Sequence, residues 1–508
     1  MTYCTPYLLQ LGLTKSKLSM VWIAGPLSGL IMQPVVGILA DKSTSKWGRR
    51  RPIMIAGTVL VSLCLFVLGW TPEIVGLFVS DEALRRKATI VLAVFSIYAL
   101  DFAINAVQAS CRSLVVDSLP ASKQQLGSAW ASRMASIGHL IGYGIGAVNL
   151  SAIFGTTLGS TQFKQLCVIA ALALIAAVGV TSWAVHERVL VHNGEDNEQP
   201  NGLVSTLSQI YQTTRNLPAR IQAICWVQFW AWIGWFPFLF YSSTWVGEIY
   251  LRYDAPHAIQ NKDTLGDVGR LGSSALIVFS MVTFTGSWVI PWLVKSPEDE
   301  QPGFTPRPPA SIAPVVKVVS KFRPSLSVAW TISHLIFAMS MAFAPFVTSF
   351  RQATLLIAIC GVPSTLANWA PFTFMGVEIN KLPSTKPRSE GPNHQQSIEL
   401  SSNSDTTSQT SSTRAHDSSS AAPTSELAGI YLGILNLYTT LPQFVATGVS
   451  TIVFSVLEPG KSPELAKDAH PDEHHGTDGY NGIAVCLFIG AVSAIVAAHA
   501  TRRLKHIA

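Results

Sequence analysis

Four polar side chains recur along one predicted helix within a strongly apolar stretch. Asp101, Asn105, Gln108 and Arg112 are spaced by four, three and four residues. At about 100° per residue they fall within a stripe of about 60°, so one helix face carries all four groups. Asp101 and Arg112 are separated by roughly 16 Å along the axis and cannot touch each other. Each charge therefore needs another partner, which can be a neighbouring helix, a substrate or a proton.

The stretch that contains this stripe is long enough to cross a membrane. Charged groups inside a membrane span are costly and normally face a bundle interior or a water-filled path. An acid and an arginine on one such face, each in need of a partner, outline a coupled transport site. The pattern itself leaves open which partner Asp101 has, a neighbouring residue, a substrate or a coupled proton, and it calls for no cofactor.

The whole chain has the composition of a membrane protein. Of its 508 residues, 49% are hydrophobic and only 13% are charged, and the mean hydropathy is +0.35, which is too apolar for a soluble globular domain. A span needs about 20 apolar residues. Eleven runs reach or approach that length: 20–40, 53–70, 89–116, 127–151, 166–185, 222–241, 273–294, 326–347, 353–376, 428–456 and 482–500. The short run 1–12 is a partial twelfth.

Charge and cysteine positions fit this class. If the 41–52 segment faces the cytosol, lysine and arginine are more frequent in the inner segments than in the outer ones, as the positive-inside rule requires. That orientation explains the net charge of +6 without nucleic acid. The seven cysteines all lie in apolar runs, which indicates neither a disulfide framework nor a metal site. The histidines at 470–475 have no firm ligand geometry.

The polar segments divide the chain into two comparable parts. We predict an N-terminal six-helix half at 1–185, a cytoplasmic central loop at 186–221 and a C-terminal six-helix half at 222–508. The Ser/Thr-rich segment at about 384–425 is expected to be disordered. Two six-helix halves are the arrangement of an all-α transporter bundle, with its site at the midplane between them.

Glycines and prolines mark where spans pack and bend. Gly138, Gly142 and Gly146 recur every four residues and predict a smooth seam for close helix packing. Pro26 and Pro34 are expected to kink the span at 20–40. His139, His334 and Glu248 are ionisable residues whose roles the sequence leaves open.

The span at 222–241 is the most aromatic stretch of the chain. Its rings go round the whole helix, so most of them must pack or face lipid. A sharper interpretation is that Trp232 and Trp235 stack on the apolar face of a sugar ring. The sequence leaves both interpretations open.

Three segments resemble one family. The 25–52 stretch GPLSGLIMQPVVGILADKSTSKWGRRRP, the pattern from Asp101 to Asp117 and the 236–250 stretch FPFLFYSSTWVGEIY are similar to sucrose/proton symporters. These belong to the glycoside–pentoside–hexuronide group of the major facilitator superfamily, which includes plant sucrose carriers and animal solute carrier family 45. The resemblance covers nearly the whole chain, and the loops look fungal.

The resemblance implies a fold and several residue roles. The fold would be the 12-helix major facilitator bundle with alternating access. Asp101 would carry the proton, and Arg112 would engage the sugar or the acid, with Asn105 and Gln108 beside it. The loop between the second and third spans would gate the inner end through an ion-pair network. Its expected members are Asp41, Arg49, Arg50, Arg51 and Asp117.

The implied function is proton-coupled import of sucrose or a related α-glucoside, and no enzymatic constellation is present. A maltose or hexose symporter and a non-transporting sugar sensor are the alternatives. The expected partners are a small sugar and the lipid bilayer, without nucleic acid, and the expected location is the plasma membrane or the vacuolar membrane. In the family the first span begins upstream of the TPYLLQLG stretch, so we expect roughly ten to fifteen further helical residues before Met1.

Overall fold

The protein is all-helical over the residues that the computed structural model describes. Those residues are 3–41, 43, 45–119, 121–185, 187, 208, 212–254, 263–295, 323–381, 422–463, 465–466, 470–474, 476 and 479–504. Within these ranges, ten helical segments are long and apolar enough to cross a membrane. The apolar run at 127–151 forms an additional helix of 27 residues, α7. The expected central loop and Ser/Thr-rich segment lie mostly outside the described residues.

The N-terminal half contains the first nine helices. Their bounds are α1 Cys4–Gln10, α2 Lys15–Val21, α3 Ala24–Asp41, α4 Arg51–Gly69, α5 Thr71–Gly76, α6 Glu82–Ser118, α7 Ala121–Ala147, α8 Leu150–Phe154 and α9 Gln162–Ala184. The short apolar run at 1–12 contains the helix α1.

The C-terminal half contains the remaining long helices. Their bounds are α11 Ala219–Ile249, α12 Thr264–Leu293, α14 Leu326–Ala342, α15 Phe350–Ile359, α16 Gly361–Lys381, α17 Ala422–Leu457 and α18 Gly482–Arg503, with a π-helical turn at Tyr250–Asp254 and 3₁₀ turns at Ala344–Phe346 and Pro471–Glu473. Two helices begin earlier than expected. α11 starts inside the predicted central loop, and α17 starts inside the predicted disordered segment.

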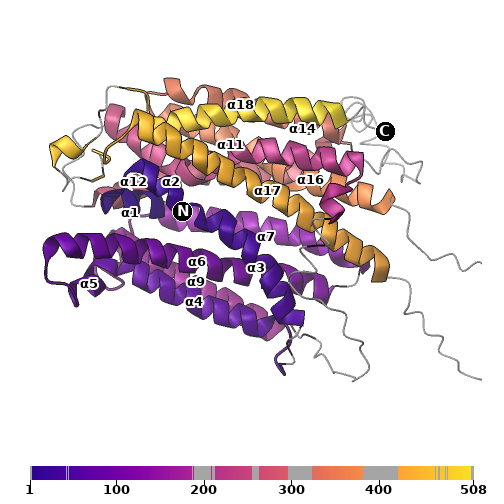
Figure 1. Ribbon diagram of the computed structural model, residues 1–508, viewed down its shortest axis with the longest axis horizontal. Coiled ribbons are helices and arrows are strands. Elements are labelled where there is room, and N and C mark those ends of the chain that lie inside the picture. Colours follow the sequence, from indigo (N-terminus) through magenta and orange to yellow (C-terminus); the bar gives the residue numbers. More distant parts are fainter. Residues whose placement is uncertain are drawn as a thin grey trace, which may run out of the picture.

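The two halves form separate groups of helices that meet along two edges. Figure 1 shows α3, α4, α6 and α9 together on one side and α11, α14, α17 and α18 together on the other. Between the groups, α7 packs on α12, α2 and α3 pack on α17, and α1 lies against α11 and α12. Two side-chain contacts cross the edge between α17 and the pair α2 and α3. The Ser19 and Thr451 hydroxyls are 2.9 Å apart, and Asn436 donates to Gln33 at 3.0 Å.

Prolines interrupt two predicted spans, because proline has no N–H to donate and its ring crowds the carbonyl four residues earlier. The run at 20–40 is divided into α2 and α3 at Trp22, four residues before Pro26. The run at 353–376, predicted as one helix, is divided into α15 and α16 just after Ile359, four residues before Pro363. At Pro34, by contrast, α3 continues.

The predicted glycine seam on α7 is only partly a packing surface. A Cβ at Gly138 or Gly142 would meet nothing within 4 Å, whereas one at Gly146 would lie 2.6 Å from the Ser273 hydroxyl of α12. Backbones do approach each other closely elsewhere, for example where α11 crosses α18. A Cβ at Gly490 would lie 2.9 Å from the Cα of Gly234. The seam prediction was therefore wrong at two of its three positions.

Candidate functional site

The polar stripe lies on α6, which is wedged between two helices of its own half. Asp81 begins the helix by accepting a hydrogen bond from the Leu84 N–H at 2.9 Å, a normal N-cap. On one side α6 approaches α4 so closely that a Cβ at Gly57 would lie 2.7 Å from Val107. On the other side it packs on α3. These contacts fix the rotation of α6 and therefore the direction in which the stripe points.

The upper part of the stripe is buried. The Asp101 side chain is only 6% exposed, and its Oδ2 atom has no hydrogen-bond partner among the described residues. Asn105 donates to the backbone carbonyl of Asp101 at 2.9 Å and to the Ser28 hydroxyl of α3 at 2.8 Å. An acceptor atom held in a buried position without a donor is suited to receiving a proton or a ligand hydroxyl.

The lower part of the stripe is open. Gln108 and Arg112 are both exposed, and the Arg112 guanidinium donates to the Gln108 side-chain oxygen at 3.1 Å. Exposure thus increases along the stripe from Asp101 towards Arg112. This side-chain hydrogen bond joins Arg112 to its neighbour on the same face and not to the acid, in agreement with the separation of Asp101 and Arg112 along the helix. The guanidinium is accessible for a polar ligand.

The structure favours packing over sugar stacking for Trp235. Its ring is 6% exposed and lies 4.5 Å from Phe337 of α14 and 5.3 Å from Phe238, inside the C-terminal half. Trp232 is half-buried against the same core. The sugar-stacking role of the two residues stays a prediction.

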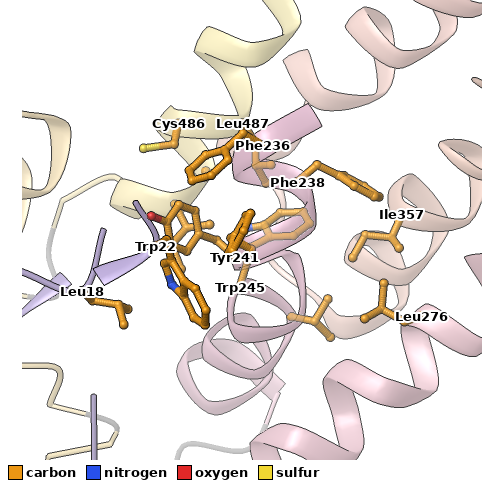
Figure 2. Close-up of a cluster of buried hydrophobic side chains, with 14 of the residues drawn as sticks. Leu18, Trp22, Phe236, Phe238, Tyr241, Trp245, Leu276, Ile357, Cys486 and Leu487 are labelled. Carbon is orange, nitrogen blue, oxygen red and sulfur yellow. The ribbon is translucent and has the colours of Figure 1, made fainter. Parts of the chain in front are cut away.

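One aromatic ring of α11 that faces the other half is Phe240, which the sequence did not single out. Its ring centroid lies 4.9 Å from that of Trp22 in α2. The backbone carbonyl of Phe240 also accepts a hydrogen bond from Thr5 of α1 at 3.1 Å. A Cβ at Gly25 would lie 3.7 Å from this ring, at ordinary contact distance, so the local sequence carried no signal for Phe240. Figure 2 shows Trp22 beside Tyr241 and Trp245, which belong to α11 as Phe240 does.

The basic segment before α4 contacts the start of the central segment. The Arg50 backbone N–H donates to the Glu187 carboxylate at 2.9 Å, and the Arg50 side chain is largely buried. Gly48 has a φ of +103°, a conformation that favours glycine, and Glu187 fills the space beside it. Arg49 and Arg51 are half-buried nearby. The side chains of the other two expected gating residues, Asp41 and Asp117, lie outside the described residues. Their gating role remains a prediction.

The structure places the three ionisable residues that the sequence left open in different surroundings. His139 is exposed and stacks on Tyr143 at 6.1 Å, beside a cavity of about 300 Å³. His334 is buried against Trp330 at 5.5 Å. Glu248 is fully buried and forms an ion pair with Lys15 at 2.7 Å. Lys15 was missed because nothing in its local sequence distinguishes it from a solvated loop lysine.

The histidines near the end of the chain have ordinary partners. His470 lies 3.1 Å from Asp472, and a ring nitrogen of His474 lies 3.0 Å from the Ala466 carbonyl. In the part of the chain that the structure describes, no group of three or more potential metal ligands comes together. His475 lies outside that part.

Two helical halves, with a polar stripe on a long apolar helix of one half, are the architecture of a multi-pass membrane transporter. The family model described as MFS/sugar transport protein matches residues 1–248. The chain is 31% identical to the general alpha-glucoside permease of Schizosaccharomyces pombe, over 99% of this chain and 89% of that protein. It is 32% identical to the sucrose transport protein SUC4 of Arabidopsis thaliana, over 48% of this chain and 51% of the plant protein.

These matches establish the family. The protein belongs to the MFS/sugar transport protein family and is a transporter, not an enzyme. Among solved structures, a variant of the nucleoside transporter NupG matches with a TM-score of 0.50 at 11% identity, covering 99% of this chain and 95% of that chain. That likeness supports the major facilitator fold, as expected from the sequence. The embedding of several helices in a membrane and a small sugar as substrate follow from the same family.

Proposed function

We propose that this protein imports sucrose or a related α-glucoside together with a proton, by alternating access. The observation that carries the proposal is Asp101. Its carboxylate is buried in a membrane-spanning helix, one oxygen lacks a hydrogen-bond partner among the described residues, and the stripe leads from it to an exposed arginine. An acid in that setting can take up a proton from one side and release it to the other as the halves move.

The proposed substrate class rests on the relatives. The permease from Schizosaccharomyces pombe is described as a general alpha-glucoside permease, and the plant relatives are described as sucrose transport proteins. In this proposal Arg112, Asn105 and Gln108 hydrogen-bond the sugar hydroxyls. A planar guanidinium suits this task because it presents several donors in a fixed geometry. Maltose and hexoses remain alternative substrates, and they are separated by competition in the same assay.

The test is uptake of labelled sucrose by a host that lacks sucrose transport, with and without a protonophore. The wild-type chain should accumulate sucrose, and the protonophore should abolish the accumulation. Asp101→Asn should reach the membrane in normal amount but should lose accumulation against a gradient. Its matched control is Asp81→Asn at the exposed start of the same helix, where asparagine also serves as an N-cap.

The control should transport like the wild type. Accumulation by Asp101→Asn at the wild-type level would overturn the role of Asp101. Uptake that is insensitive to the protonophore would overturn proton coupling. Accumulation of maltose or glucose with no competition by sucrose would overturn the proposed substrate, and specific sugar binding without any uptake would favour a sensor.

A further inference from the structure

A cluster of buried charges joins the two halves at the end opposite the basic 41–51 segment. We call this the outer end, following the charge bias. Lys15, at the start of α2, lies 2.7 Å from Glu248 at the end of α11 and 2.8 Å from Glu458, which follows α17. The three side chains are 1%, 0% and 2% exposed. Lys15 belongs to the N-terminal half, and both acids belong to the C-terminal half.

Both acids have further described partners in the C-terminal half. Arg252 lies 3.5 Å from Glu458, which also accepts the Gly482 N–H at 3.2 Å. Asn481 donates to Glu248 at 2.7 Å. The four described charges of the cluster therefore balance, with two cations and two carboxylates. If Lys15 moved away with its own half, Asn481 would still donate to Glu248 and the Gly482 N–H to Glu458. The two carboxylates would then share one described cation, Arg252, where before they shared two.

An apolar layer lies directly next to this cluster. Leu18 of α2 and Trp22 directly after it are buried, and the Trp22 ring centroid lies 4.9 Å from that of Phe240 in α11; Figure 2 shows Trp22 beside Tyr241. On the side of α17, the Ser19 hydroxyl lies 2.9 Å from that of Thr451. The segment from Lys15 to Trp22 thus contributes both ionic and apolar contacts across the interface. These contacts exclude water, and exclusion of water strengthens the ion pairs.

We propose that Lys15 is the latch of an outer gate, and that its ion pairs with Glu248 and Glu458 must break whenever the transport path opens to the outer side. The reason is geometric. Opening requires the outer end of α2 to separate from α11 and α17, and Lys15 is the charged side chain of α2 that is inserted between them. The latch depends on the two-half architecture and not on the identity of the sugar or the coupling ion.

Gate closure can be measured without transport, by disulfide formation between Ser19→Cys and Thr451→Cys. A protease site inserted into the central segment at 188–207 allows cross-linked halves to be separated from free ones on a non-reducing gel. The two single-cysteine variants control for the native thiols. Mild oxidation should cross-link the pair rapidly and stop sugar uptake, and a reductant should restore both the free halves and uptake.

The latch is then tested in this cross-linking background. Lys15→Met should lower the cross-linking rate about tenfold or more, because close charge pairs at interfaces contribute strongly to association. Lys17→Met, an exposed lysine on the same helix, is the matched control and should change nothing. Lys15→Met alone leaves a buried negative charge unbalanced. Lys15→Met combined with Glu248→Gln keeps the charges balanced, since Arg252 still faces Glu458, and it should fold while still cross-linking slowly.

Two results would overturn the proposal. One is a double variant that cross-links at the wild-type rate, because the ion pair would then not hold the gate closed. The other is a fully cross-linked Ser19→Cys/Thr451→Cys protein that transports sugar normally, because the outer ends of α2 and α17 would then not need to separate. The second result is decisive even if the Lys15 variants do not reach the membrane.

Discussion

Replacing Gly234 by alanine should destabilise the C-terminal half, because α11 and α18 cross there at backbone contact. A Cβ at this position would lie 2.7 Å from the carbonyl oxygen of Gly490 and 3.1 Å from the Phe337 ring. The first neighbour is backbone and cannot rotate away, so the helices must separate locally. Overpacking of this kind costs about 1–3 kcal/mol. The clash lies in the most extensive helix contact of α11, which is the one with α18, so separation of these helices should lower the stability of the whole half.

The matched control is Gly179→Ala on α9, where an added Cβ would meet nothing within 4 Å. Both variants gain the higher helix propensity of alanine, so the difference between them isolates the clash. At about 2–4 °C per kcal/mol for a half of this size, Gly234→Ala should melt about 2–12 °C below the control.

Melting can be followed with a thiol-reactive dye, since Cys225, Cys360 and Cys486 are buried until the protein unfolds. The heating rate must be kept constant because membrane proteins of this size unfold irreversibly. A Gly234→Ala protein that melts together with Gly179→Ala would refute the reasoning, since the helices would then have room that the structure does not show. Gly490→Ala should repeat the loss, because its Cβ would meet Gly234 at 2.9 Å.

Two further predictions concern the polar stripe and the basic segment. Arg112→Lys should lower initial sucrose uptake to about a tenth or less at normal surface expression, because a lysine cannot reproduce the planar set of donors. If this variant kept a normal uptake rate and apparent affinity, Arg112 would be merely structural. Arg49→Glu should slow turnover more than it weakens sugar binding, since Arg49 lies at the inner rim. Uptake rate and sugar-dependent thermal protection measure the two quantities, and lost protection with normal turnover would count against a gating role.

The sequence alone was sufficient for the class of protein and for the polar stripe. Long apolar runs can satisfy their backbone groups in a membrane only as helices, so the number and position of the spans follow from composition. The side-chain period of a helix likewise places Asp101, Asn105, Gln108 and Arg112 on one face, whatever surrounds them. Pro26 was expected to kink its span, and the helix is interrupted four residues before it, because the effect of a proline is local.

Contacts between distant segments could not be derived in this way. Small residues permit close packing but do not require it, and so Gly138 and Gly142 proved to be open while Gly234 and Gly490 meet across two helices 256 positions apart in the chain. Aromatic residues surround the whole of α11, and only the rotation of that helix shows that Trp235 faces the interior of its half while Phe240 faces the other half.

The buried charges at the outer end could not be recognised from the sequence either. In the sequence, Lys15, Glu248 and Glu458 are single charges in three separate outer segments, each of which could be solvated. Whether these charges interact strongly depends on their distance and burial. A charge in water is nearly independent of its neighbours, whereas a buried one must be compensated. The apolar pattern determined that two halves would form within a membrane. Only the tertiary structure, by bringing α2 against α11 and α17, decided which charges hold those halves together.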